Sequence, residues 1–414
     1  MKHVALLDCN NFFVSCERLF RPDLGNKPVV VLSGNDGCVV ARSNEVKDMG
    51  IPMGIPHFKV RNEFKDAGVT VFSSNFSLYH DISKRVMRVL REEVDEVKQY
   101  SIDEAFFSLI GVRGEIETEL RRIKNAVETK VGIPVTLGAG RSKTIAKVAS
   151  KIGKNREGVC LLEGKNWIDV QQTVELSSVW GIGPKISQRM MRDGLVTVAD
   201  FLALPRRKIC DLYSINEVRK YDELTENAME EIKGESGSQQ SIMSTHSLSK
   251  ATNDLNVLKN EVTHHVTSAA RDLRKKRFVA THMYIIMRPS RYGDWRLRGG
   301  SIDITLENPT DDSRVLLKMA KEAVSSAFEE KVPYKKVGVV FSGLFPARLV
   351  QDTLFAPHNP KGGELMKLLD RVNNKLGRGA ITIGEEIHGS TSVKKNHLSP
   401  AYTTKWTDIR TVKT

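Results

Sequence analysis

The sequence predicts an α+β protein in which two β-α-β-β-α-β units flank a helical region. Residues 1–165 show strand, helix, hairpin, helix and strand patterns in that order, interrupted by an insertion at 12–75. Residues 241–345 repeat the order strand, helix, strand, strand, helix, strand. We expect a ferredoxin-like topology for both units. Between them, a Gly-Ile-Gly turn at 181–183 separates two helical stretches, which favours a small helical domain.

Length and charge narrow the class of protein. A chain of 414 residues holds about two to four domains. The net charge of +13 favours a polyanionic partner, either nucleic acid or an anionic surface. The five cysteines are scattered and form no C-x-x-C pair, which is typical of thiols in a reducing cytosol, so they indicate neither zinc nor a disulfide framework. No apolar run is long enough for a membrane span or a signal peptide, so we expect a cytoplasmic protein without a membrane.

Two adjacent acids interrupt an apolar hairpin predicted at 97–110. Asp103 and Glu104 lie between apolar residues, where an unpaired carboxylate is costly. Asp8, at the end of the apolar run Val4–Leu7, supplies a third acid. Ligands that offer only oxygen atoms suit Mg²⁺, so the three acids predict a metal site. For Asp103 and Glu104 alone, an acidic turn is the alternative interpretation.

Two adjacent aromatic residues follow the first acid. Phe12 and Phe13 cannot point the same way, and we expect Phe12 to be in the core. Phe13, five residues after Asp8, is close enough to form the floor of a substrate pocket. Further on, a small-residue turn at 33–42 enters a helix predicted at 43–49.

Basic residues lie near this turn and on a second helix. Arg42 and Lys47 place positive charge close to the turn, although ordinary surface charge is the alternative. A helix predicted at 144–153, with Ser142 as its N-cap, carries basic residues on one face, namely Lys147, Lys151 and Lys154. This face suits either a phosphate clamp or plain solvation.

Three motifs together carry a resemblance to a known family. They are Asp8 with Phe12-Phe13, the run Asn35-Asp36-Gly37-Cys38-Val39-Val40-Ala41-Arg42, and the run Ser101-Ile102-Asp103-Glu104-Ala105-Phe106. The chain resembles the Y-family translesion DNA polymerases, and within them the UmuC type of bacterial DNA polymerase V and its Gram-positive and phage relatives. The resemblance spans nearly the whole chain and implies a right-hand polymerase. Its parts are a palm at 1–11 and 76–165, small fingers at 12–75, a thumb with its linker at 166–240, a little finger at 241–345, and a C-terminal tail at 346–414.

The resemblance implies error-prone, template-directed DNA synthesis past damaged bases, as part of SOS-type damage tolerance and mutagenesis. A primer 3′-hydroxyl would attack the α-phosphorus of a dNTP. Asp8, Asp103 and Glu104 would hold two Mg²⁺ ions with the Cys9 carbonyl, and Phe13 would be the steric gate against ribose. Small residues over the nascent base pair, Gly37 and Cys38, imply weak selection by shape and therefore low fidelity.

The resemblance also assigns triphosphate contacts to basic and polar residues, namely Arg42, Asn44, Lys47 and Lys154. The family often has Tyr and Arg where Asn44 and Lys47 stand. The Gly138-x-Gly140 turn before Lys143 is not a P-loop, because the Walker spacing is absent.

DNA contacts are expected in two regions. The turn with Gly181, Gly183 and Lys185 looks like a helix-hairpin-helix, whose glycines let backbone N–H groups approach a phosphate. A plain helical turn is the alternative. Basic residues then crowd 271–298, and we expect them to form a basic sheet edge that binds duplex phosphates through Arg288, Arg296 and Arg298.

The tail after residue 345 has little regular pattern, with several prolines and a Gly-Gly pair. It contains Gln351-Asp352-Thr353-Leu354-Phe355, which has the Q-x-x-L-F form of bacterial clamp-binding peptides. Gln351, Leu354 and Phe355 are therefore candidate contacts to a DNA sliding clamp, and packing on the preceding domain is the alternative.

Primer-template DNA and dNTPs are the partners that the resemblance implies. It leaves open whether a UmuD-type subunit or a recombinase filament also takes part. Two rivals come from other classes. A nucleotidyl cyclase would share the palm acids but would not need the helix-hairpin-helix or the basic domain. A non-catalytic, clamp-docking DNA-binding protein would not need the three acids together.

Overall fold

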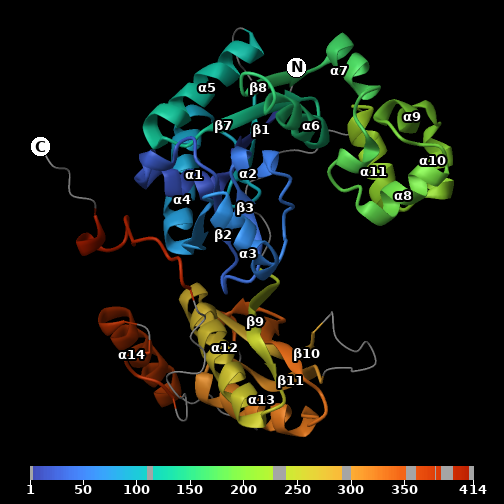
Figure 1. Ribbon diagram of the computed structural model, residues 1–414. Helices are drawn as coiled ribbons and strands as arrows, with labels where there is room; N and C mark the ends of the chain where they lie inside the picture. Colours follow the sequence, from blue (N-terminus) through green and yellow to red (C-terminus); the bar gives the residue numbers. More distant parts are fainter. Residues whose placement is uncertain are drawn as a thin grey trace, which may run out of the picture. The chain divides into compact units, whose positions relative to one another are not determined.

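The computed structural model describes residues 3–109, 115–226, 239–290, 300–350, 360–377, 379–383 and 395–409 (Figure 1). The chain divides into two compact units. Unit 1 comprises Met1–Ser236 together with Lys395–Thr414, and unit 2 comprises Gly237–Lys394. The chain therefore passes from one unit to the other twice, and the residues predicted to form a single C-terminal tail belong to both units.

The larger sheet of unit 1 has five strands in the order β5-β6-β1-β7-β8. β1 (Val4–Cys9) lies between β6 (Glu104–Ser108) and β7 (Val135–Gly140) and is antiparallel to both. β5 (Val97–Gln99) and β8 (Val159–Leu162) are the edge strands. The order β5-β6-β1-β7 is that of a ferredoxin-like fold, to which β8 adds a fifth strand parallel to β7.

Side chains of β1 alternate between two cores. Ala5 and Leu7 belong to the core that contains residues of α4 (Phe76–Glu93) and α5 (Ile116–Val131). Val4 and Leu6 pack with Phe106 of β6 and Ala146 of α6 (Lys143–Gly153). This alternation is the period of a strand buried on both faces. It leaves Asp8 at the end of an apolar strand with helices on either side.

A close approach of α6 to the sheet requires glycine at one position. A Cβ atom at Gly138 in β7 would lie 2.0 Å from the backbone nitrogen of Ser150 in α6. Ser142 caps α6 as predicted, because its side chain accepts a hydrogen bond from the backbone N–H of Ile145 at 3.3 Å. Both features fix the helix that carries Lys147 and Lys154.

A smaller sheet and four helical segments form the region between β1 and α4. Its strands run in the order β3-β2-β4. Their core is apolar and includes Val30, Leu32, Val46 and Phe64. The elements, in chain order, are α1 (Phe12–Phe20), η1 (Pro22–Leu24), β2 (Val29–Leu32), β3 (Val39–Arg42), α2 (Asn44–Asp48), α3 (His57–Asp66) and β4 (Thr70–Ser73).

The predicted helical domain packs on α6 through a shared core that includes Ile145 and Val148. The Gly181–Gly183 turn lies between η2 and α8, so a short 3-10 turn, and not an α-helix, stands before it. The elements are α7 (Gly164–Gln171), η2 (Leu176–Ser178), α8 (Pro184–Arg192), α9 (Val198–Ala203), α10 (Arg206–Leu212) and α11 (Ile215–Leu224).

Unit 2 has the predicted order of elements but not the predicted topology. Its antiparallel sheet runs β11-β10-β12-β9, and α12 and α13 share the core on one of its faces (Figure 1). A ferredoxin-like fold would place the first strand beside the third, whereas among the described strands β9 pairs only with the last, β12. The expectation of a second ferredoxin-like unit is therefore wrong. The elements are β9 (Ser241–Thr252), α12 (Leu255–Lys276), β10 (Phe278–Pro289), β11 (Ile302–Thr310), α13 (Ser313–Ala327) and β12 (Tyr334–Ser342).

The segment after β12 is more regular than expected. After β13 (Phe345–Pro346) and η3 (Ala347–Leu349), it contains α14 (Pro360–Leu376), which buries Met366, Leu369 and Asn373 along one side. A last 3-10 turn, η4 (Trp406–Asp408), lies in unit 1. Among the described residues, none of the helices is both long and apolar enough to cross a membrane.

Candidate active site

The three predicted acids come together at the ends of two neighbouring strands. Asp8 on β1 lies directly opposite Glu104 on β6. Asp103 precedes β6, and its carbonyl accepts a hydrogen bond from the backbone N–H of Cys9 at 2.9 Å. The hydroxyl of Ser101 donates to the Asp103 carboxylate and accepts from the backbone N–H of Glu104 at 3.1 Å, which fixes the turn between β5 and β6.

The electrostatics of this cluster favour a cation. Burial raises the pKa of Asp8, the neighbouring charges of Glu104 and Asp103 raise it further, and Lys154 lowers it. The Lys154 ammonium lies 2.8 Å from the Asp8 carboxylate, and the Lys147 ammonium lies 2.9 Å from Glu104. Each of these two acids therefore has a positive partner from α6 or its C-terminal end. Carboxylate oxygens grouped in this way are the ligand type that Mg²⁺ prefers.

Lys147 is more constrained than a surface lysine. Its ammonium lies 4.7 Å from the centre of the Tyr100 ring and 5.2 Å from that of Trp180. Trp180 immediately precedes the Gly-Ile-Gly turn, and Lys220 of α11 lies 4.2 Å from its ring. Lys147 thus links an acid of the cluster to the helical domain. It also lines a small cavity together with Asp8, Lys151 and Lys154.

Phe13 is half-buried in the first turn of α1, while Phe12 is only 3% exposed, as predicted for a core residue. The Phe13 ring stacks on Tyr79 of α4, with 4.4 Å between ring centres and 13° between planes. Phe76 meets it edge-on at 6.1 Å. Aromatic side chains of α4 therefore pack against Phe13, the residue predicted to form a pocket floor.

The predicted triphosphate contacts cluster around the start of α1 and α2. Lys47 donates to the side-chain oxygens of Asn11 at 2.6 Å and Asn44 at 3.2 Å. Arg42 donates to the carbonyl of Ile51. Burial lowers the pKa of Lys47, and the positive charges of Lys154 and Arg42 lower it further. An anion bound near these cations would relieve their mutual repulsion.

The helix-hairpin-helix residues are accessible. Gly181, Gly183 and Lys185 are all exposed, and Gly181 adopts a φ of 94°, in the left-handed region that favours glycine. Gly183 is the N-cap of α8, and Pro184 opens the helix. The turn therefore offers backbone N–H groups and a helix N-terminus to a phosphate.

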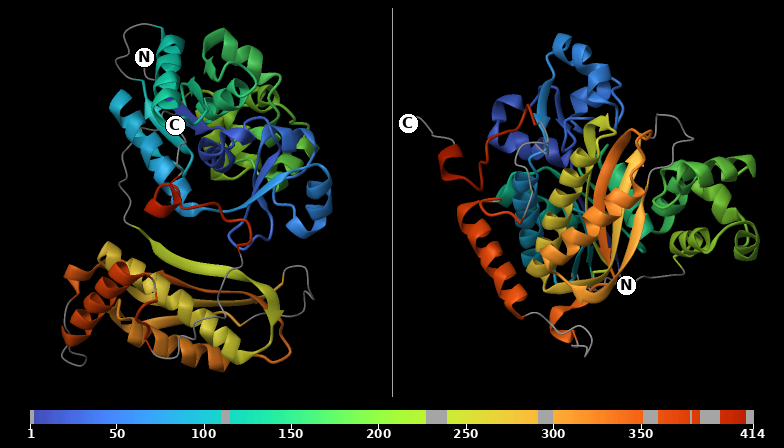
Figure 2. Two further views of the ribbon diagram at one scale, coloured as in Figure 1. Left: turned by 60° about the vertical axis from the view of Figure 1, so that its left-hand side comes forward. Right: turned by 90° about the horizontal axis from the view of Figure 1, so that it is seen from below.

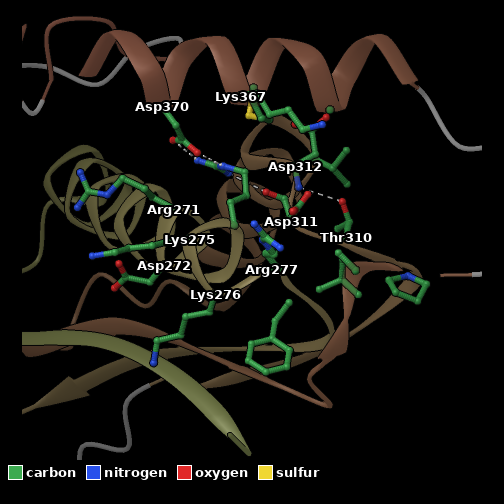
Figure 3. Close-up of a pocket in the computed structure, with 18 of the residues that line it drawn as sticks. Arg271, Asp272, Lys275, Lys276, Arg277, Thr310, Asp311, Asp312, Lys367 and Asp370 are labelled. Carbon is green, nitrogen blue, oxygen red and sulfur yellow. Dashed lines mark hydrogen bonds and ion pairs between the residues drawn. The ribbon is translucent and has the colours of Figure 1, made fainter. Parts of the chain in front are cut away.

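Basic residues of unit 2 fall into two sets with different surroundings. Arg288 of β10 is exposed and lies opposite Lys336 of β12. Arg296 and Arg298 lie outside the described residues. The basic residues at 271–277 belong to the C-terminal end of α12 and line a groove that α14 also borders (Figure 3). The expectation that the whole run forms one sheet edge is therefore wrong for these residues.

Arg274 shows how the basic residues at 271–277 differ from the exposed Arg288. Its side chain is 8% exposed and is bound by both oxygens of Asp370 of α14, at 2.6 and 2.9 Å. It also donates to the carbonyl of Asp311 at 2.8 Å. A guanidinium group held in this way attaches α14 to the rest of unit 2 and is not free for a phosphate.

Two further groups of residues are the clamp motif and a polar cluster in unit 2. The clamp-motif residues Gln351, Leu354 and Phe355 lie outside the described residues. A cluster that the sequence analysis missed consists of His246 of β9 with Glu261 and His265 of α12, whose ligand atoms all lie within 4.8 Å of one another. The spacing of Glu261 and His265, four residues apart on one helix, is a signal that could have drawn attention to it.

The chain is similar to known protein families and to several full-length relatives. Residues 7–151 match the impB/mucB/samB family, and residues 239–354 match the C-terminal domain of that family. Residues 364–412 match a domain of unknown function, DUF4113. Protein UmuC of Salmonella typhimurium is 34% identical over 99% of this chain and 100% of its own. Protein ImpB of the same species is 33% identical over 98% of both chains. DNA polymerase IV of Bacillus velezensis is 25% identical over 92% of both.

Solved structures show the same fold. A Y-family DNA polymerase chimera of Dbh and Dpo4 superposes with a TM-score of 0.69 at 19% identity, covering 83% of this chain and 99% of its own. DinB from Sulfolobus solfataricus has a TM-score of 0.52 at 20% identity, covering 82% of this chain and 98% of its own. From its family matches, its full-length relatives and this fold, the chain belongs to the impB/mucB/samB family and has the architecture of the Y-family DNA polymerases.

Proposed function

We propose that the protein is a DNA-directed DNA polymerase that carries out error-prone translesion synthesis. The observation that carries the proposal is the pairing of Asp8 and Glu104 on adjacent strands, with Asp103 one residue away. The relatives named UmuC and DNA polymerase IV support the same activity. A nucleotidyl cyclase would not need the exposed Gly181–Gly183 turn, and a non-catalytic DNA-binding protein would not need three acids at one end of a buried sheet.

The acid cluster fits divalent metal ions. All of its donors are oxygens, and burial raises the pKa of the Asp8 carboxyl in spite of the nearby Lys154, so a bound cation would favour the charged form of this acid. We assign two Mg²⁺ ions to Asp8, Asp103, Glu104 and the Cys9 carbonyl. When bound, such ions lower the pKa of a primer 3′-hydroxyl and stabilise the leaving pyrophosphate.

The remaining residues of the pocket have roles that follow from their chemistry. Arg42, Lys47 and Lys154 supply positive charge for a dNTP triphosphate, and Asn44 holds Lys47 beside them. Phe13 presents a flat, supported ring to the sugar and excludes a 2′-hydroxyl. Gly181, Gly183, Lys185 and Arg288 hold the duplex through its phosphates without reading its sequence.

The proposed partners are primer-template DNA, dNTPs and a bacterial sliding clamp that binds Gln351, Leu354 and Phe355. A UmuD-type subunit is a further candidate because one of the relatives that cover nearly the whole chain is named UmuC. We assign the protein to the cytoplasm, where these substrates are found.

A primer-extension assay tests the proposal. Purified full-length protein is incubated with Mg²⁺, dNTPs and a labelled primer on two templates, one undamaged and one with a single abasic site. We expect extension on both templates, with frequent misincorporation on the undamaged one. A cyclase would convert a nucleoside triphosphate to a cyclic product without primer or template, and a non-catalytic binding protein would shift the DNA in a gel without extending it.

A further inference from the structure

The last described segment of the chain lies against the catalytic unit. Residues 395–409 run beside α1 and α4 and pair with the end of β4 (Figure 2). Ser399 and Tyr402 are only 6% and 8% exposed. The Tyr402 ring stacks on Phe20 of α1 with 4.6 Å between centres and 3° between planes. The segment is therefore packed into unit 1, although the chain enters it from unit 2.

Ser399 is bound on both sides. The side-chain amide of Asn75 donates to the Ser399 hydroxyl at 3.0 Å and to the carbonyl of Pro400 at 3.2 Å. The same Asn75 caps α4 by accepting a hydrogen bond from the N–H of Leu78. The Ser399 hydroxyl in turn donates to the carboxyl of Glu17 in α1 at 3.1 Å. One side chain of the segment thus joins α1 to the start of α4.

A short chain of contacts leads from Ser399 to Phe13. The Tyr79 hydroxyl donates, at 2.7 Å, to the same Glu17 oxygen that Ser399 binds, and the Tyr79 ring stacks on Phe13. Glu17 is completely buried, and its other carboxyl oxygen has no hydrogen-bond partner among the described residues. Removing Ser399 would leave this buried group with Tyr79 as its one remaining donor, which is costly.

The segment reaches the nucleotide pocket by a second route. Lys395 donates to the carbonyl of Ser74 at 3.0 Å, and its ammonium lies 5.9 Å from the centre of the Phe76 ring, which meets Phe13 edge-on. The backbone N–H of Asn396 donates to the Asp36 carboxylate at 2.8 Å. Asp36 precedes Gly37 and Cys38, the small residues expected over the nascent base pair.

We propose that residues 395–409 form a positioning strap for the nucleotide pocket, in which Ser399 and Tyr402 hold α1 against α4 and thereby set the Phe13 ring. The proposal rests on the proposed function of Phe13 as a steric gate. It gives a role to part of the region 364–412, whose family match has no known function. This strap belongs to unit 1 but contains none of the residues proposed to touch the nucleotide, so loss of its contacts would loosen the gate without changing any of those residues.

The test measures the ratio of ribonucleotide to deoxyribonucleotide incorporation on an undamaged primer-template. A ratio within one preparation does not depend on how much of the protein is folded. Ser399→Ala and Tyr402→Ala should each raise it about 2- to 10-fold, the range that one net hydrogen bond or ring contact supplies. Trp406→Ala is the matched control, because Trp406 belongs to the same segment but is 89% exposed. A chain that ends at residue 394 should show a larger rise, which a peptide spanning 395–414 should reverse.

Three results distinguish an error in the strap proposal from an error in the steric-gate assignment. If Phe13→Ala raises the ratio but neither strap variant nor the shortened chain does, the strap proposal is wrong and the steric-gate assignment stands. If Phe13→Ala leaves the ratio unchanged, the gate assignment is wrong and the strap proposal fails with it. If Trp406→Ala raises the ratio as much as Ser399→Ala, the effect is not carried by the contacts described above, and the proposal is again overturned.

An independent observation concerns the polar cluster in unit 2. His246 Nδ1 lies 2.5 Å from His265 Nε2, and His246 Nε2 lies 3.4 Å from the Glu261 carboxylate. Ser244 makes a hydrogen bond to the other nitrogen of His265 at 2.8 Å. Glu261 is 2% exposed, and the oxygen that faces His246 has no hydrogen bond to any described residue. A buried carboxylate oxygen that has no donor among the described residues, and that lies close to two imidazoles, is an expensive arrangement in the absence of a cation.

We infer that His246, Glu261 and His265 form a zinc site that attaches β9 to α12. Two imidazoles and a carboxylate are a common ligand set for Zn²⁺, and the bond from Ser244 would orient His265. The three ligand atoms lie within 4.8 Å of one another, which is close enough for a single ion after small side-chain rotations.

The zinc content of untagged, full-length protein tests this inference. The Asp103→Asn background removes one acid of the active site, which could also bind divalent ions. After incubation with Zn²⁺ and dialysis, we expect about one zinc per chain, lost in Glu261→Gln and in His246→Asn. The second variant changes the most exposed ligand and is therefore the less disruptive for folding. Zinc retained in folded His246→Asn, or absent from the parent protein, would overturn the inference.

Discussion

The Lys154 ammonium lies 2.8 Å from the Asp8 carboxylate, although the two residues are expected to serve different ligands. Asp8 is assigned to a metal ion and Lys154 to a triphosphate. Their ion pair spans the end of α6 and the end of β1, and it neutralises the acid in the absence of substrate. Binding of a dNTP with metal ions would exchange this pair, because Asp8 would then hold a cation and Lys154 the triphosphate.

This exchange predicts the effect of Lys154→Ala. We expect the KM for dNTP to rise about 10-fold, equivalent to the loss of one charge-assisted hydrogen bond, with a smaller change in kcat. Steady-state single-nucleotide insertion measures both constants. Lys151→Ala is the matched control because Lys151 lines the same cavity but has no ion pair with a described acid. If Lys154→Ala and Lys151→Ala raise the KM equally, dNTP binding depends on the overall positive charge of the cavity and not on the ion pair with Asp8.

Asp103→Asn is expected to abolish primer extension while leaving DNA affinity within a few-fold. The amide cannot replace a charged metal ligand, whereas the proposed duplex contacts come from other residues. Extension assays and equilibrium DNA binding at fixed salt measure the two effects. Asp95→Asn, an exposed acid just before β5, is the control and should behave like the parent protein. Extension by Asp103→Asn at a comparable rate would show that the metal assignment is wrong.

Phe13→Ala is expected to admit ribonucleotides at least 10-fold more readily than the parent protein. The ring stacks on Tyr79 and cannot retreat from a 2′-hydroxyl without losing that contact. Competition between rNTP and dNTP at a single template position measures the selectivity. Tyr79→Phe keeps the stacked ring but loses the hydrogen bond to Glu17, so its ratio should rise no more than the 2- to 10-fold expected of Ser399→Ala. Unchanged selectivity in Phe13→Ala would identify Phe13 as a core residue only.

The acid hairpin and the first sheet could be predicted from the sequence because both depend on local patterns. Asp103 and Glu104 stand out in an apolar hairpin, and alternation in β1 identifies a doubly buried strand that ends in an acid. The strand order of unit 2 could not be predicted in this way, because the sequence of elements does not determine whether β9 lies between β11 and β12, as in a ferredoxin-like fold, or at the edge of the sheet beside β12. That choice depends on long-range contacts between side chains.

Other features were missed for identifiable reasons. Pro360 and Gly362-Gly363 are breakers in most contexts and predict irregular chain where α14 lies, yet a proline is favourable at the first turn of a helix. The contact between Ser399 and Glu17 joins residues 382 positions apart, and nothing in either local sequence signals it. The cluster of His246, Glu261 and His265 likewise forms only when β9 packs on α12.

The buried Glu17 predicts a pH dependence of stability. Burial raises its pKa from 4.5 to about 7, although the Tyr79 and Ser399 hydroxyls lower it. The folded protein therefore holds this proton more tightly than the unfolded chain does. The contribution of this proton to the free energy of unfolding is fully present below about pH 4.5 and is lost as the pH rises through about 7. The loss amounts to roughly 2–4 kcal/mol.

Glu17→Gln isolates this contribution. The amide keeps an acceptor for Tyr79 and Ser399 but does not titrate. Between pH 5 and pH 8, the free energy of unfolding from urea titrations should fall less in the variant than in the parent, by about that amount. Glu63 is an exposed glutamate of α3, and Glu63→Gln should leave the slope of the unfolding free energy against pH unchanged. Identical slopes in Glu17→Gln and the parent would mean that Glu17 ionises normally in the folded protein.

The clamp motif gives the last prediction. An extended peptide with Gln351 at the rim of a groove and Leu354 and Phe355 in an apolar pocket is a familiar form of peptide recognition. Burial of these two side chains is worth about 1.5–3 kcal/mol each, which is enough for micromolar binding together with a few hydrogen bonds. Replacing all three residues by Ala should leave synthesis on a bare primer intact and remove stimulation by a loaded sliding clamp.

Two measurements distinguish this interpretation from packing on the neighbouring domain. A thermal melt and a basal extension assay on the triple variant should match the parent if the motif serves a partner. If both fall together, Leu354 and Phe355 belong to a core of unit 2. If the variant is stable and active but still responds to the clamp, the tether lies elsewhere in the C-terminal region. Asp352→Ala, within the same motif but outside its fixed positions, should retain clamp stimulation and so shows that the effect requires Gln351, Leu354 and Phe355 themselves.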